Sequence, residues 1–77
     1  MITIEDFQSV LQQAKDLVPH APNEEAKKQM LLLINDGEQA VALCHKLQTT
    51  EFTGVEEKIV REAMQIIQEL YNKYASN

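Results

Sequence analysis

The residues of this chain that could carry out chemistry are few, and their spacing does not suit it. Cys44 and His45 are adjacent, so on a helix their side chains point about 100° apart and do not readily hold one metal ion. His20 stands between Pro19 and Pro22, in a connection where an imidazole can bind a ligand or titrate near neutral pH. We interpret both histidines as solvated and Cys44 as a small buried hydrophobic residue. The sequence therefore predicts no metal site, no cofactor and no catalytic residue.

Paired acids and glycine loops, two other common signs of an active site, have simpler explanations here. The pairs Glu24-Glu25 and Glu56-Glu57 fall in the first turns of predicted helices, where the helix dipole favours negative charge. The chain has 2 glycines, too few for a glycine-rich phosphate loop. We expect that the protein is not an enzyme.

Small acidic helical families do not account for the chain. Acyl carrier proteins need an Asp-Ser-Leu attachment site that opens a helix, whereas the serines here are Ser9 and Ser76. Asn35-Asp36-Gly37 is only a fragment of an EF-hand loop. We recognise no family from the sequence.

Basic residues suggest one alternative function. Lys27 and Lys28 lie near the start of a predicted helix, and Arg61 lies in another helix. In an oligomer with pockets between subunits, these cations could meet a small anionic ligand such as a nucleotide. Isolated lysines are more often simply solvated, so this hypothesis ranks second.

Composition restricts the classes of partner. The 77 residues include 12 acidic and 7 basic side chains, giving a net charge of −5. Such an acidic chain is a poor ligand for nucleic acid or for an anionic membrane. Its longest apolar run, 30–34, is far shorter than the roughly 18 residues of a membrane span. We expect one domain over residues 1–77, located in the cytoplasm, with no nucleic-acid or membrane partner.

Three helices and no strand are predicted, in an all-α three-helix bundle with a long central helix. Thr3 is a good N-cap for the first helix, near 3–18, and Val18-Pro19 ends it. Its apolar stripe comprises Phe7, Val10, Leu11, Ala14, Leu17 and Val18. Asn23 caps the second helix, near 23–48.

Gly37 is the most informative residue of the second helix. It lies in the middle of an apolar stripe with helical spacing, although glycine costs about 1 kcal/mol against alanine there. A close approach of a neighbouring helix, or a kink, would explain that cost. Asn35-Asp36-Gly37 could also break the region into two helices, but the stripe keeps its phase, which favours one continuous or kinked helix. The stripe comprises Ala26, Met30, Leu33, Ile34, Gly37, Val41, Cys44 and Leu47.

The third helix is predicted near 54–75, with Thr53 and Glu56 as a capping box. Its expected core stripe comprises Val55, Ile59, Ala63, Ile66, Ile67, Leu70 and Tyr74. The opposite face, which includes Lys58, Glu62, Gln65 and Glu69, should remain in water.

The apolar arcs of the second and third helices are wider than a single small core requires. Leu32 and Leu43 extend the second arc to about 200°, and Val60, Met64 and Tyr71 extend the third to about 180°. These five residues predict a second buried surface, most simply a homodimer interface, because a chain of this size has only a marginal core. The alternative is that they are ordinary exposed apolar residues.

The function that follows is a small non-enzymatic module for protein–protein interaction, self-associating and acting as an adaptor, inhibitor or regulator. A bacterial or phage origin would fit so compact a chain. The alternatives are the anionic-ligand binder described above and a structural subunit of a larger assembly. The sequence does not name the partner or the process.

Overall fold

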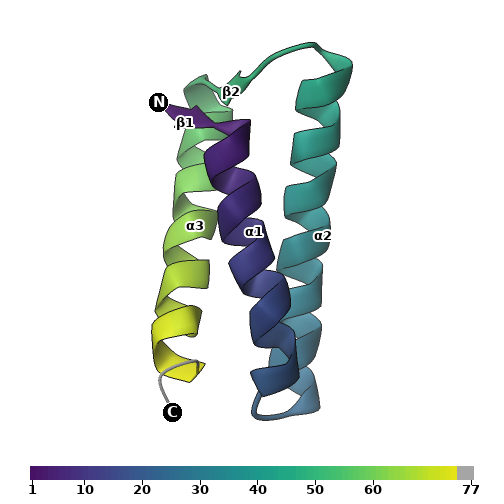
Figure 1. Cartoon of the computed structure of the whole chain (residues 1–77), viewed down its shortest axis with the longest axis vertical. Coiled ribbons are helices and arrows are strands. Elements are labelled where there is room, and N and C mark those ends of the chain that lie inside the picture. Colours follow the sequence, from purple (N-terminus) through teal and green to yellow (C-terminus); the bar gives the residue numbers. More distant parts are fainter. Residues whose placement is uncertain (75–77) are drawn as a thin grey trace.

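The computed structural model describes residues 1–74 and contains three long helices and two very short strands (Figure 1). The elements follow one another as β1 (Ile2–Thr3), α1 (Ile4–Leu17), the 3-10 turn η1 (Val18–His20), α2 (Glu24–Lys46), β2 (Glu51–Phe52) and α3 (Gly54–Tyr74). The predicted all-α three-helix fold is confirmed, and the helix ends agree within two residues over the described part. The predicted end of the third helix, residue 75, lies outside the described residues.

The expectation of no strand is wrong. β1 and β2 pair in antiparallel register, Ile2 opposite Phe52 and Thr3 opposite Glu51. Ile2 and Phe52 are both buried, so this pair fixes the start of α1 against the start of α3. A two-residue strand is too short to show the alternation by which strands are recognised in a sequence.

Local capping explains where the first two helices begin. The Thr3 hydroxyl accepts a hydrogen bond from the backbone N–H of Asp6 at 3.1 Å. The Asn23 side chain accepts one from the N–H of Ala26 at 2.8 Å. Each cap satisfies a backbone donor that the first turn leaves free. α2 ends before Gln48, which takes a left-handed conformation with φ of 59°.

α2 runs unbroken through the Asn35–Gly37 segment, as the phase of its stripe predicts. Gly37 is a position of close helix packing: a Cβ built on it would lie 2.6 Å from Cδ2 of Leu11 and 3.1 Å from Cζ of Phe7. The missing side chain therefore lets α1 approach the backbone of α2.

The long helix α2 is the middle helix along the chain, whereas α1 is the middle helix in space (Figure 1). α1 packs against both α2 and α3, which have little direct contact with each other. Phe7 of α1 meets Phe52 of β2 edge to face, with ring centroids 5.4 Å apart. The buried stripe of α1 is therefore shared between its two neighbours, and one side of α2 and of α3 remains without a helix against it.

Among the described residues, no helix combines the length and the apolar character needed to cross a membrane.

Candidate protein-binding surface

The residues considered for chemistry lie apart from one another. Cys44 is buried, 3 % exposed, on the side of α2 that faces the core. His45 and His20 are both exposed, the first on α2 and the second in η1. Within residues 1–74 the structure brings together no group of three or more potential metal ligands.

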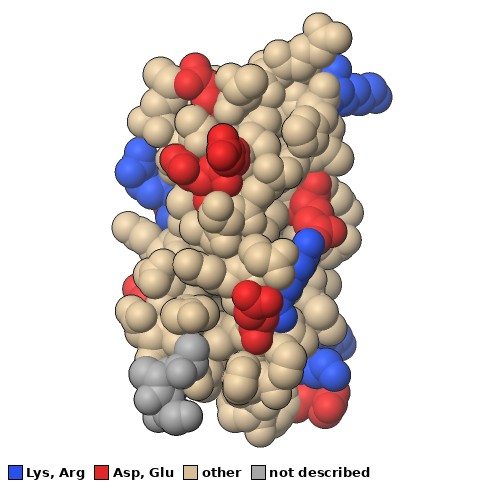
Figure 2. All heavy atoms as spheres, viewed as in Figure 1, with Lys and Arg blue, Asp and Glu red and all other residues tan. Residues whose placement is uncertain are grey.

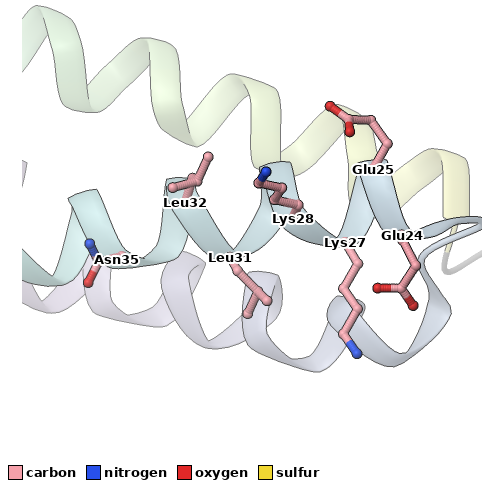
Figure 3. A pocket seen from close by; sticks show the side chains of 7 residues that line it. All are labelled: Glu24, Glu25, Lys27, Lys28, Leu31, Leu32 and Asn35. Carbon is pink, nitrogen blue, oxygen red and sulfur yellow. The ribbon is translucent and has the colours of Figure 1, made fainter.

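The structure does not bring Lys27 and Lys28 close to Arg61, although the anionic-ligand hypothesis joins these basic residues in one site. Lys27 and Lys28 lie beside Glu24 and Glu25 along a shallow surface of α2 alone (Figure 3). Arg61 lines a separate hollow between α1 and α3.

The Arg61 guanidinium forms an ion pair with a carboxylate on its own helix. Its Nη2 lies 2.7 Å from Oε1 of Glu57, one turn earlier. This hydrogen bond, helped by the positive amino terminus 3.5 Å from the same oxygen, lowers the pKa of the Glu57 carboxyl below its ordinary value.

The five predicted interface residues do not form one surface. Val60 is 4 % exposed and belongs to the core of the chain itself. Met64 is partly buried against that core and lines the hollow between α1 and α3. Tyr71 is exposed near the end of α3. Leu32 and Leu43, in contrast, are 56 % and 48 % exposed on α2 and are available to a partner.

α3 is rotated relative to the expectation from its sequence. Val60 and Ile67 are the residues it buries, whereas the predicted core residues Val55, Ile59 and Ile66 are exposed. At 100° per residue, the buried direction lies about 70° from the centre of the predicted stripe. The prediction of α3's core face is therefore confirmed for Ile67 and wrong for Val55, Ile59 and Ile66, because α3 packs on α1 with one edge of its apolar arc. The rest of the arc forms a surface.

That surface faces α2 across an apolar groove. Near β2 the groove has a hollow of about 170 Å³, lined by Ala40, Leu43, Phe52, Glu56, Ile59 and Val60. Near η1 it has a second hollow of about 280 Å³, lined by Ala26, Gln29, Met30, Leu33, Ile66, Leu70 and Tyr74. No residue of α1 lines either hollow, so both open between α2 and α3. We call this surface, including both hollows, the α2–α3 groove.

Both walls of the groove repeat with helical spacing. On α2 the residues that line the two hollows recur after three, four or seven positions: Ala26, Gln29, Met30, Leu33, Ala40 and Leu43. Met30 also belongs to the adjacent row that is buried, together with Ile34, Gly37, Val41 and Cys44. On α3 the matching row is Ile59, Ile66 and Leu70. Such rows are typical of helices that receive another helix.

The charges beside the groove are mainly acidic. On a helical projection at 100° per residue, one basic and four acidic residues of α2 and α3 lie within about 70° of the side of their helix that faces the groove. They are Lys73, Glu25, Asp36, Glu56 and Glu62. Glu25 and Leu32 are directed to the side of α2 on which α3 lies, whereas Leu31 is directed to the opposite side (Figure 3).

The exposed face of α1 has a different character. Its water-facing positions are Glu5, Asp6, Gln8, Ser9, Gln12, Lys15 and Asp16, all polar. The view over α1 accordingly shows scattered acidic groups, some of them next to a base (Figure 2). One such pair joins Lys15 of α1 to Glu38 of α2 at 2.7 Å. The apolar surface therefore belongs to the α2–α3 side.

Sequence reasoning missed the groove residues Ile59 and Ile66 by assigning them to the core. The width of the apolar arcs was the signal that a second surface exists, but it did not say which edge of each arc would be buried.

The chain matches no family model, no curated protein and no solved structure.

Proposed function

We propose that this protein is a small non-enzymatic module for protein–protein interaction, acting as an adaptor, inhibitor or regulator through the α2–α3 groove. The observation that carries the proposal is the set of large apolar side chains left in water on that side. Leu43 is 48 % exposed, Ile59 60 % and Ile66 48 %, and they line the same groove. Contiguous apolar surface of this kind marks interaction sites more often than scattered single residues do.

The remaining surface supports binding rather than catalysis. The histidines are exposed and lie apart from the acid–base pair of Glu57 and Arg61, whereas catalysis requires such groups to be held together in a sheltered cleft. Self-association, which would make the chain a homodimer, is one way to cover the groove. A different protein is the other.

A crosslinking experiment tests the proposal without knowledge of the partner. A photoreactive amino acid replaces Ile59 in the groove or, as a control, Leu31, which is 48 % exposed on another side of α2. Irradiated cells that express the protein should give discrete covalent adducts from position 59, either to another protein or to a second copy. The adducts should be lost when Leu43→Glu places a charge in the groove.

Equal adducts from positions 59 and 31, or adducts from position 59 that persist with Leu43→Glu, would exclude the groove as the binding surface.

A further inference from the structure

We infer that the α2–α3 groove receives one amphipathic helix of another protein, with Leu or Ile along its buried stripe and Lys or Arg along both edges. This inference rests on the proposed function and deepens it by naming the chemistry of the partner. Its basis is the shape of the groove, the spacing of its walls and the charge beside it.

The shape fits a single helix. The groove lies between two helices and extends along α2 from Ala26 to Leu43. At a rise of about 1.5 Å per residue, these positions are about 26 Å apart, the length of a helix of roughly 17 residues. A stable complex buries about 800 Å² on each partner, roughly a seventh of this chain's surface of 5390 Å². A helix of five turns in a two-walled groove is an occupant of that order.

The walls define the spacing of the partner's apolar residues. Ala40 of α2 is a small residue that lines the hollow near β2, and Leu33, Leu43, Ile59 and Ile66 line the groove around it. This small residue leaves room for a large side chain of an incoming helix, whose apolar residues would insert with steps of three and four. This arrangement converts the three-helix fold into a four-helix one, with α1 and the guest helix on opposite sides of the α2–α3 pair.

The charge beside the groove determines which charged residues a partner helix should carry along its edges. Asp36 of α2 and Glu62 of α3 lie about midway along the length of the groove, one on each helix, and are exposed beside it without lining either hollow. Glu25 and Glu56 extend the acidic character towards the two ends. Basic residues at the edges of a guest helix would meet these carboxylates, as residues at the e and g positions do in paired helices.

A second copy of this chain is a poorer occupant. Docking two copies groove to groove places their acidic edges together, and like charges opposite one another are unfavourable. The polar outer face of α1 supplies no apolar stripe to insert. The acidic edges also oppose adsorption to an anionic membrane, where basic residues provide the attraction.

Synthetic helical peptides of 18 residues test the inference directly. The first carries Leu at the stripe positions and Lys at the edges; the second has the same stripe with Glu at the edges; the third keeps Lys and replaces the stripe with Ala. Fluorescence anisotropy should show the first binding at least tenfold tighter than either of the others. Its advantage over the Glu peptide should shrink as NaCl is raised from 50 mM to 500 mM, because salt screens the edge charges.

Matched variants assign the site. Leu43→Glu and Ile66→Glu should each weaken the Lys peptide at least tenfold, while Leu31→Glu, at the same 48 % exposure, should leave it unchanged. The double variant Asp36→Lys with Glu62→Lys should reverse the preference towards the Glu peptide. The double variant Glu5→Lys with Asp16→Lys changes the net charge equally on α1 and should not reverse it. Circular dichroism checks that every variant is folded.

The outcomes separate the two proposals. Suppose that the Lys peptide binds no more tightly than the other two peptides, while position 59 crosslinks to another protein and Leu43→Glu abolishes that crosslink. The basic-helix inference is then wrong and the proposed function stands. A groove that crosslinks only to a second copy identifies a homodimer and overturns the inference. Binding of the Lys peptide that Leu43→Glu and Leu31→Glu weaken equally is non-specific attraction and also overturns it. If position 59 gives no crosslinks that depend on the groove, the proposed function itself is wrong.

Discussion

Gly37 of α2 and Leu11 of α1 lie so close that a methyl group on the glycine would stand 2.6 Å from Cδ2 of the leucine. Both residues are buried. This contact sets the distance between the two helices and explains why a glycine occupies the middle of a long helix. It also allows the first prediction, in which packing and helix propensity act in opposite directions.

Gly37→Ala should lower the free energy of unfolding by about 1 kcal/mol. Helix propensity alone would raise it by a similar amount, but overpacking a tight contact costs about 1–3 kcal/mol. Urea denaturation measures the difference. The control is Ala42→Gly, at an exposed position of the same helix, which should show the propensity effect alone. In the Leu11→Ala background Gly37→Ala should become stabilising. A higher midpoint for Gly37→Ala alone would contradict the packing argument.

The neighbouring residues Ile59 and Val60 test the rotation of α3. Ile59 is 60 % exposed and Val60 4 %, the reverse of the sequence prediction. Val60→Ala should destabilise by about 1–3 kcal/mol, because it removes buried methyl groups and leaves a cavity. Ile59→Ala should change stability by less than about 0.5 kcal/mol, as is usual for surface substitutions. Thermal and urea unfolding compare the two variants. If Ile59→Ala destabilises the protein as much as Val60→Ala does, or more, α3 packs through its other edge.

The features that the sequence predicted well are local. Thr3, Asn23 and Pro19 act on the backbone within a turn of themselves, so the helix ends follow from residue type. Gly37 was identified because a glycine within an apolar stripe has a cost that tertiary packing must offset. The stripe of α1 is narrow, and its buried side was therefore unambiguous.

The features that were missed depend on choices between long-range contacts. α3 has apolar residues at 59, 60, 63, 64, 66, 67, 70 and 71, an arc wide enough to pack in more than one rotation. Contact with α1 selected Val60 and Ile67, and nothing local to α3 encodes that selection. The pairing of Ile2 with Phe52 likewise joins distant residues without a sequence pattern. The excess of apolar surface was therefore predictable, but the residues that form the groove were not.

Glu57 gives a prediction about pH. Its folded-state pKa is lowered, first by the hydrogen bond from Arg61, so its contribution to stability is present above the ordinary value of 4.5 and is lost as the pH falls through the folded value. Glu57→Gln should remove part of the decline in unfolding free energy between pH 6 and about pH 3. The effect should be small, because the pair is solvated. Urea unfolding at each pH compares the variant with Glu62→Gln; an unchanged acid slope in Glu57→Gln would contradict the assignment.

Salt should control self-association through the α2–α3 groove. The acidic residues Asp36 and Glu62 repel their counterparts in a second copy at low salt, whereas the apolar side chains of Leu43 and Ile66 favour contact. The screening length falls from about 10 Å at 0.1 M salt to about 3 Å at 1 M, so the repulsion weakens while the apolar attraction remains. Sedimentation velocity at 100 µM should therefore show a monomer in 50 mM NaCl and a growing dimer fraction in 1 M NaCl. Leu43→Glu should abolish that dimer and Leu31→Glu should not; a dimer that is strongest at low salt, or is insensitive to Leu43→Glu, would place the contact elsewhere on the molecule.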